Sequence, residues 1–252
     1  MLKAKHGLSF VVAAIFVLLL VACGDDDSDF ATRPSEGSSS SVTPQSSDSE
    51  TSVSTGTMTD SRDGQTYKTV TIGTQTWMAQ NLNYETANSY CNNNDASNCT
   101  KYGRLYTWAA AMDSAGTWSA NGKGCGYNKT CSPTYPVRGV CPDGWHLPTQ
   151  AEWNTLFTAV GGSSTAGKML KSTSGWNSSG NGTDAYSFSA LPAGYRNGSG
   201  GDNLGGSYAG FWSSTEDGSY NAYFMNLYYG NGNAYLNILN KYDEFSVRCL
   251  KD

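Results

Sequence analysis

Residues 141–153 read CPDGWHLPTQAEW, and they mark the start of the chain's most clearly predicted helix. Thr149 is a helix N-cap residue, and Glu152 three positions later completes a capping box, which satisfies two N-terminal backbone N–H groups. Pro148 and the pair Gly161-Gly162 bound the helix on its two sides. Apolar residues at helical spacing predict one buried face, made of Trp153, Leu156, Phe157 and Val160.

Further elements are predicted on both sides of this helix. Alternation over residues 67–72 and 75–78, broken at Gly73-Thr74, predicts a β-hairpin. A helix is predicted over residues 103–113, and a shorter one over residues 166–171. Later strands are predicted, with a hairpin turn at residues 230–233, over residues 186–191, 210–214, 220–228, 234–240 and 245–250. The fold class is therefore α+β, with helices early and a mostly antiparallel sheet late.

The N-terminus predicts export and a lipid anchor. Residues 1–22 combine a short basic start with an apolar run of about 15 residues, which is typical of a secretory signal peptide and too short for a comfortable membrane span. Residues 20–23, LVAC, resemble the lipobox of bacterial lipoproteins, so Cys23 is expected to become the acylated N-terminus of an outer-membrane lipoprotein. The acidic run after it, residues 25–29, fits either a surface-export signal or a solvated linker.

Residues 23–58 are predicted to be a disordered tether, and residues 59–252 a single domain. The stretch 24–57 has eleven serines and only one aromatic residue, too little apolar surface to offset the entropy of ordering. Seven of the 21 acidic residues precede Met58, so the domain carries 14 acids against 13 bases. A near-neutral domain without a basic stripe is not expected to bind nucleic acid.

Six cysteines follow Cys23, an even number that predicts three disulfides in an exported chain. Sequence alone allows 15 pairings. Proximity favours Cys91–Cys99 and Cys125–Cys131, which leaves Cys141–Cys249. The alternative, a zinc site, is disfavoured because the spacings do not fit and because His146 is the one histidine after the signal peptide.

Several motifs resemble the Fibrobacter succinogenes major paralogous domain over essentially the whole predicted domain. They are DGQTY at 63–67, IGTQTWMAQNL at 72–82, YGRLYTW at 102–108, CPDGWHLPT at 141–149, FWSSTE at 211–216 and SVRC at 246–249. The resemblance brings no known reaction with it, so it supports an assignment of family and not of activity.

A looser resemblance links LPTQAEW at 147–153 and VRC at 247–249 to the formylglycine-generating-enzyme and sulfatase-modifying-factor fold. It implies a C-type-lectin-like α+β domain with two main helices, a mostly antiparallel sheet and long Gly/Asn-rich loops. The pair of reactive cysteines of that oxidase and the calcium motifs of sugar-binding lectins are absent, so neither activity carries over.

Catalysis is not predicted, and no catalytic residue is assigned. His146 is better explained by packing or capping than by acid–base chemistry, because no second histidine accompanies it. The carboxylates available for hydrolysis show no spacing that selects a pair: Asp202, Glu216, Asp217, Asp243 and Glu244.

A ligand-binding groove is predicted around the Gly-rich segment 195–208. Aromatic faces stack on the C–H faces of sugars, while amide, carboxylate and guanidinium groups bond their hydroxyls. The predicted lining is Tyr195, Arg196, Asp202, Asn203, Tyr208, Trp212 and Glu216. For Trp212 the alternative, a place in the core, is favoured.

No cofactor is expected. Structural calcium stays open at residues 92–95 and 202–203, which are rich in oxygen ligands. Two classes of function lead: a membrane-anchored, non-catalytic module that binds polysaccharide, and a structural or protein-interaction component of the envelope. An enzyme of unknown reaction is the least favoured alternative.

Overall fold

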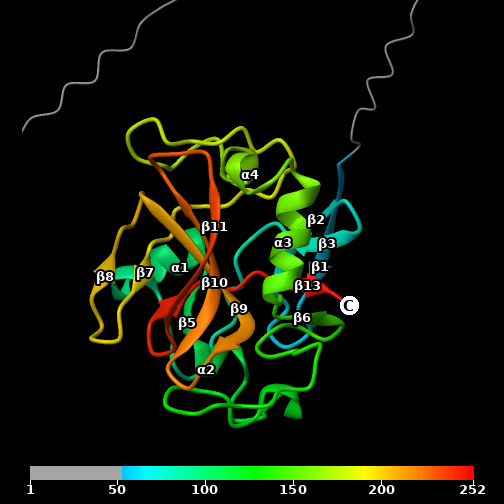
Figure 1. Ribbon diagram of the computed structural model, residues 1–252, viewed down its shortest axis with the longest axis vertical. Helices are drawn as coiled ribbons and strands as arrows, with labels where there is room; N and C mark the ends of the chain where they lie inside the picture. The colour runs from blue at the N-terminus through cyan, green and yellow to red at the C-terminus, as the bar shows by residue number, and fades with distance from the viewer. Residues whose placement is uncertain (1–52) are drawn as a thin grey trace, which may run out of the picture. The chain divides into compact units, whose positions relative to one another are not determined.

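The computed structural model describes residues 53–252 (Figure 1). The predicted signal peptide, the lipidation site Cys23 and residues 24–52 of the predicted tether lie outside the described residues. The described residues combine helices with three antiparallel sheets, so the α+β class is confirmed.

The first sheet joins the two ends of the domain. Its strands, in order across the sheet, are β1 (Ser54–Thr59), β2 (Thr66–Ile72), β3 (Gln75–Met78), β13 (Leu250–Lys251) and β6 (Trp145–His146). The predicted hairpin is present as β2 and β3. Leu250 pairs with Trp77 on one side and His146 on the other, so the C-terminal strand β13 joins β3 to β6.

Strand β1 lies N-terminal of the boundary predicted at Thr59. It pairs with β2 along its whole length, from Ser54 opposite Thr71 to Thr59 opposite Thr66. The prediction of a disordered tether through residue 58 was therefore wrong at its C-terminal end. Ser/Thr-rich composition predicted disorder, but β-branched threonine also suits a pleated strand.

The second sheet has the order β11-β10-β9 and follows the predictions closely. Its strands are β9 (Tyr208–Asp217), β10 (Asn221–Tyr228) and β11 (Ala234–Asn240). Helices α3 (Gln150–Ala159) and α4 (Ser163–Leu170) lie against β10 and β11 (Figure 1). In α3 the capping box between Thr149 and Glu152 is present as predicted.

The third sheet consists of short strands. They are β4 (Ser89–Tyr90), β5 (Leu105–Thr107), β12 (Glu244–Phe245), β7 (Tyr195–Arg196) and β8 (Asp202–Asn203). Three predictions were wrong in this part of the chain. Residues 103–113 form β5 and the short helix α2 (Trp108–Ala111), residues 186–191 form no strand, and residues 245–250 divide between β12 and β13.

Gly103, the first residue of the helix predicted over 103–113, ends the preceding helix instead, and residues 105–107 pair with β4 and β12 as a strand. The Gly103 φ of 74° is a left-handed conformation, and an added Cβ would lie 2.8 Å from the Leu82 carbonyl oxygen. The preceding helix, α1 (Ala96–Tyr102), ends against it. Thr107 then starts α2 by accepting a hydrogen bond from the Ala110 backbone N–H.

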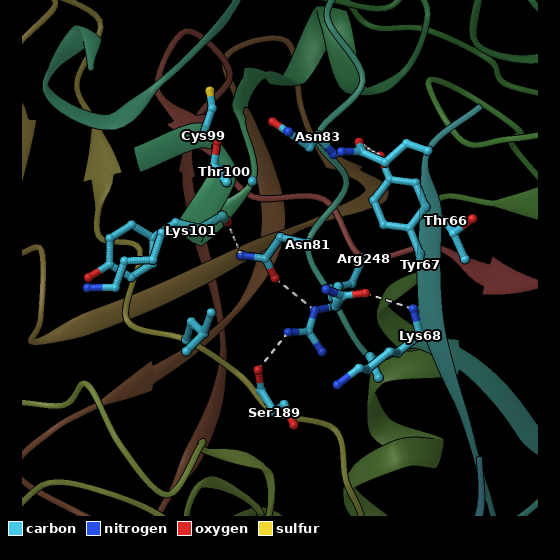
Figure 2. A pocket seen from close by; sticks show the side chains of 16 residues that line it. Thr66, Tyr67, Lys68, Asn81, Asn83, Cys99, Thr100, Lys101, Ser189 and Arg248 are labelled. Atoms are coloured by element: carbon cyan, nitrogen blue, oxygen red, sulfur yellow. Dashed lines mark hydrogen bonds between the residues drawn. The ribbon is translucent and has the colours of Figure 1, made fainter. Parts of the chain in front are cut away.

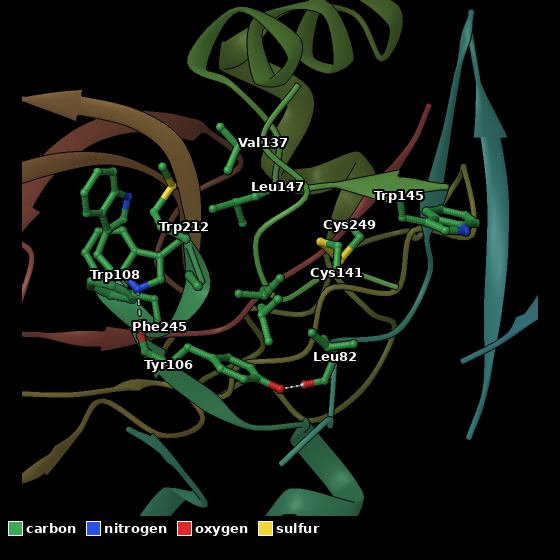
Figure 3. Packing of buried hydrophobic residues seen from close by; sticks show 14 of the residues in the cluster. Leu82, Tyr106, Trp108, Val137, Cys141, Trp145, Leu147, Trp212, Phe245 and Cys249 are labelled. Carbon is green, nitrogen blue, oxygen red and sulfur yellow. Dashed lines mark hydrogen bonds between the residues drawn. A yellow bond between two sulfur atoms is a disulfide. The ribbon is translucent and has the colours of Figure 1, made fainter. Parts of the chain in front are cut away.

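Two buried clusters form the core. One gathers Trp77, Trp153, Phe188 and Phe211 between the first sheet and helix α3. The other contains Trp108, Tyr106, Phe245 and the Cys141–Cys249 disulfide (Figure 3).

The three disulfides have the predicted pairings, Cys91–Cys99, Cys125–Cys131 and Cys141–Cys249. The last spans 108 residues, and in the chain-entropy model a loop of that length stabilises the fold by about 4–5 kcal/mol.

Candidate functional site

The aromatic residues predicted to line a groove are packed into the domain instead. The Tyr195 ring stacks on Phe245 at a centroid distance of 5.5 Å, and Tyr208 packs edge-on against Tyr195 at 6.0 Å. Trp212 is 0% exposed, and its Nε1 donates to the Tyr106 carbonyl at 2.7 Å. Trp212 is therefore a core residue and cannot stack on a ligand, which corrects its place in the predicted groove.

The polar residues of the predicted groove are largely engaged within the protein. Arg196 Nη1 donates to both carboxylate oxygens of Glu244, at 2.8 and 3.0 Å, and the guanidinium lies over the Tyr90 ring at 4.2 Å. Asn203 Nδ2 donates to the Gly201 carbonyl, and the side chain of Asp202 is not among those that the structure describes. Burial thus removes Trp212 from the predicted lining, while ligand binding by the other predicted residues stays a prediction.

The Gly-rich loop does reach an exposed aromatic surface. Gly198 N–H donates to Asp243 Oδ1 at 3.0 Å, and the loop backbone lies so close to Tyr242 that a methyl group at Gly198 would overlap the ring. The Tyr242 ring is therefore packed against the Gly-rich loop.

Three exposed tyrosines form this surface: Tyr127, Tyr220 and Tyr242, here named the tyrosine triad. Their exposed fractions are 45%, 49% and 45%, values high for aromatic side chains. The ring centroid of Tyr127 lies 5.4 Å from that of Tyr220 and 5.0 Å from that of Tyr242. Single exposed apolar residues are common on proteins, but three rings joined through the central Tyr127 form a patch.

A buried lysine anchors all three segments of the triad. Lys241 Nζ donates to Glu216 Oε2 at 2.8 Å, to the Lys129 carbonyl at 3.0 Å and to the Gly218 carbonyl at 2.9 Å. It also lies over the Trp108 ring at 4.5 Å. Lys129 is in the loop of Tyr127, Gly218 is in the turn of Tyr220, and Lys241 directly precedes Tyr242.

The loop that carries Tyr127 is held by further contacts. The Cys125–Cys131 disulfide closes it, and the Cys131 backbone N–H donates to Glu216 Oε1 at 3.1 Å. The Lys129 backbone N–H donates to the Ser219 carbonyl at 3.2 Å, which ties this loop to the turn of Tyr220. Glu216 therefore contributes to the base of the triad and does not line a groove.

The tyrosine triad was missed at the level of sequence. Each tyrosine occurs in a turn beside Gly, Ser, Asn or Asp, where burial is improbable: Gly126-Tyr127-Asn128, Ser219-Tyr220-Asn221 and Lys241-Tyr242-Asp243. Aromatic residues in such turns were the available signal, although nothing local shows that the three turns meet.

His146 occupies a structural position in the described residues. It is 5% exposed, with Nε2 at 3.0 Å from Glu152 Oε1 and Nδ1 at 2.6 Å from Asp252 Oδ1. Burial by itself lowers the pKa of His146, but the hydrogen bonds and charges of the two carboxylates outweigh it and raise this pKa overall. Both ring nitrogens are thus engaged between β6, α3 and the C-terminus.

The first segment considered for calcium, residues 92–95, is engaged in hydrogen bonds with backbone groups. Asp95 accepts a hydrogen bond from the Ser97 N–H and caps α1, and Asn92 Nδ2 donates to the Ala193 carbonyl at 2.7 Å. Within residues 53–252 no group of three or more His, Cys, Asp or Glu side chains is placed to hold a metal. Calcium binding stays an untested prediction.

The fold and this surface define the class of protein. It is a disulfide-stabilised α+β domain that displays an exposed aromatic patch above a buried ion pair. The chain belongs to the Fibrobacter succinogenes major domain family, whose model matches residues 70–251. No curated protein and no solved structure gives a significant match to the chain.

Proposed function

We propose that the chain is an envelope-anchored lipoprotein that displays a non-catalytic domain for binding polysaccharide, with the tyrosine triad as its binding surface. The observation that carries this proposal is the cluster of three exposed rings, at centroid distances of 5.0 and 5.4 Å, on one rigid base.

The chemistry of the triad suits an uncharged sugar polymer. Tyrosine presents an apolar face for stacking and a hydroxyl for hydrogen bonding. The neighbours Asn128 and Asn221 supply further amide groups in the same turns. Because Lys241 and the Cys125–Cys131 disulfide already hold these turns, binding would cost little ordering entropy.

Lipidation and outer-membrane localisation are also part of the proposal. The lipobox-like LVAC at residues 20–23 supports acylation of Cys23 and an outer-membrane location, at the periplasmic or the outer face. Among the described residues no helix is both long and apolar enough to cross a bilayer. Incorporation of labelled palmitate by the chain, lost in Cys23→Ala, tests the anchor.

We also propose a C-type-lectin-like architecture for the domain. Support comes from the first sheet, in which the N-terminal strands β1–β3 and the C-terminal strand β13 are neighbours. The long irregular stretches 113–144 and 171–194, interrupted by one short 3-10 helix at Ala120–Gly122, fit the loop-rich part of that architecture.

A pull-down on insoluble polysaccharides tests the binding function. The full chain, purified in mild detergent with its disulfides formed, is mixed with cellulose, xylan, chitin and peptidoglycan. We expect retention on at least one polymer, and loss of that retention when Tyr127, Tyr220 and Tyr242 are all replaced by alanine.

The matched control is Tyr235→Ala, because Tyr235 is 36% exposed and lies on β11, outside the triad. Trp212→Ala is unsuitable, since removing a fully buried ring damages the core. Retention that is unchanged in the triple variant, or absent from every polymer, would exclude the proposed function.

A second candidate is a protein-interaction component of the envelope. Strand β11 is an edge of the second sheet, and Ile238 on it is 46% exposed. Exposed edge strands pair readily with segments of other proteins. If this candidate holds, cross-linking of the chain to an envelope protein in intact cells should be lost in Ile238→Lys and kept in Tyr242→Ala.

A further inference from the structure

A second surface feature is a cavity of about 240 Å³ between β2, the segment after β3, and α1 (Figure 2). Its lining holds three cationic side chains, Lys68, Lys101 and Arg248, and no carboxylate. In a domain whose charge is nearly balanced, such a one-signed cluster is unusual.

Among the described residues, Arg248 is a buried cation without a salt bridge. It is 0% exposed, and all its acceptors are neutral. Nε donates to Asn81 Oδ1 at 2.8 Å and Nη2 to the Ser189 carbonyl at 2.9 Å, while Nη1 donates to two further carbonyls, those of Met78 and Phe188. Burial lowers the pKa of Arg248 to about 9, as expected for a cation that lacks a counter-charge.

The contrast with the other arginines is clear. Within residues 53–252, each of the other four is paired with a carboxylate: Arg62 with Asp60, Arg104 with Glu85, Arg138 with Asp143 and Arg196 with Glu244. Asp184 acts on Arg248 only at longer range, because its carboxylate accepts hydrogen bonds from the Ser189 backbone N–H and Oγ. Buried charges are normally paired, so this cation leaves an uncompensated positive charge beneath the cavity.

The two lysines stand at the cavity surface, above this buried charge. Both are exposed, and no carboxylate of the described residues forms an ion pair with either. Lys101 Nζ lies over the Tyr102 ring at 4.6 Å. Figure 2 shows Arg248 set among Asn81, Ser189 and Lys68, while Lys101 lies on the α1 side of the cavity with its side chain beside Tyr102.

The rest of the lining suits a hydroxylated ligand. The Oε1 atoms of Gln65 and Gln80 already accept hydrogen bonds, from Tyr67 Oη and the Lys68 backbone N–H, which leaves Nε2 as the group that each amide can still use. Thr66 and Thr100 add hydroxyl groups. A volume somewhat below the usual range of about 300–1,000 Å³ fits a single sugar residue better than a larger compound.

A neighbouring cavity of about 550 Å³ extends this site along β1. The two cavities share Lys68, Ala79 and Ser189, and the second is also lined by Thr55, by Thr57 and by one carboxylate, that of Asp184. A sugar chain bound in the first cavity could therefore continue beside the edge strand.

We propose that the cavity between β2 and α1 is a second binding site, for the carboxylate-bearing residue of an acidic saccharide such as a uronic acid. The carboxylate would lie near Lys68 above Arg248, Lys101 would add positive charge from the α1 side of the cavity, and the amides and hydroxyls would bind the sugar hydroxyls. This site does not depend on the tyrosine triad, so either proposal can fail without the other.

Isothermal titration of the full chain with glucuronate, glucose, acetate and inorganic phosphate tests the site. Glucuronate is expected to bind at least tenfold more tightly than glucose, which has the same ring without the carboxylate, and more tightly than acetate or phosphate. Binding should weaken with added salt, because the lysines are exposed to solvent.

Variants locate the site. Lys68→Met with Lys101→Met should weaken glucuronate binding at least tenfold, while Lys123→Met, another exposed lysine that does not line the cavity, should leave it unchanged. Equal binding of glucuronate and glucose, or no effect of the double variant, would overturn the proposal. Phosphate or acetate binding as tightly as glucuronate would overturn the saccharide assignment.

Discussion

Lys241 Nζ lies 2.8 Å from Glu216 Oε2, and this buried pair holds the turns on which the three exposed tyrosines are displayed. The lysine side chain is 0% exposed and that of Glu216 is 16% exposed. Lys241 also bonds a carbonyl 112 residues earlier in the chain, that of Lys129. The exposed surface therefore depends on an ion pair that lies beneath it.

Lys241→Met should destabilise the domain and separate the three tyrosine rings of the triad. Removing one partner leaves Glu216 with a poorly compensated charge, a change that costs about 3–5 kcal/mol when a pair is fully buried and somewhat less here. The free energy of unfolding, measured by denaturant titration, should fall by about 3 kcal/mol.

The double variant with Lys241→Met and Glu216→Leu distinguishes charge from packing. Because it removes both charges, it should recover part of the lost stability. If the single and double variants are equally stable to denaturant, the ion pair does not organise this surface.

His146 predicts how stability changes with pH. Its pKa in the folded chain is raised above the ordinary value of 6.5, so its contribution is complete below about pH 6.5 and is lost as the pH rises through the raised value. The pKa of Glu152 is lowered from 4.5, because hydrogen bonds from His146 and Thr149 outweigh burial. Its contribution is present above pH 4.5 and is lost on acidification.

The His146–Glu152 pair should therefore stabilise the fold most between about pH 4.5 and 6.5. Denaturant titrations at several pH values should show the chain losing stability from pH 6 to 8, and His146→Gln should lose less over that interval. A variant whose pH profile runs parallel to the parent's would show that His146 does not titrate with folding.

Local signals predicted the elements that are fixed by local chemistry. The capping box of Thr149 and Glu152 gave the start of α3, and the glycine-asparagine turn at 230–233 gave the hairpin of β10 and β11. The disulfide pairs followed from proximity, since two of the three close short loops.

Properties that depend on distant contacts were not predictable from the sequence. Trp212 lies in β9, whose residues Ala209–Ser214 are all buried, so alternation could not show which side chains face solvent. The triad needs three turns to meet over a buried lysine, and a lysine is normally taken as a surface residue. Strand β1 was hidden by its own composition, because serine and threonine also dominate the preceding tether.

The role of β1 can be tested by deleting residues 53–58 from the full chain. The deletion removes the partner of β2 and the contacts that Val53 and Met58 make with the core clusters. Cross-strand pairs contribute roughly 0.2–1 kcal/mol each, so stability should fall by about 1–3 kcal/mol. Deleting the equally long segment 38–43 of the predicted tether is the control, and should leave denaturant stability unchanged.

Exposing β2 as a new edge should also promote association, because a free strand edge is a template for pairing. Light scattering of the 53–58 deletion should show it, whereas the 38–43 deletion stays unchanged. If both deletions behave alike in scattering and denaturation, residues 53–58 belong functionally to the tether.

Gly198 links the Gly-rich loop to the proposed binding surface, and Gly198→Ala tests that link. The new methyl group would overlap the Tyr242 ring, so the ring or the loop must move. Because no positive φ is involved, the backbone itself tolerates alanine.

If the triad binds polysaccharide, retention in the pull-down should fall by about tenfold, equivalent to 1.4 kcal/mol. Gly205→Ala is the control from the same segment, since the nearest atom to its added Cβ is 4.0 Å away. Equal retention of the two variants would show that the position of Tyr242 does not matter for binding.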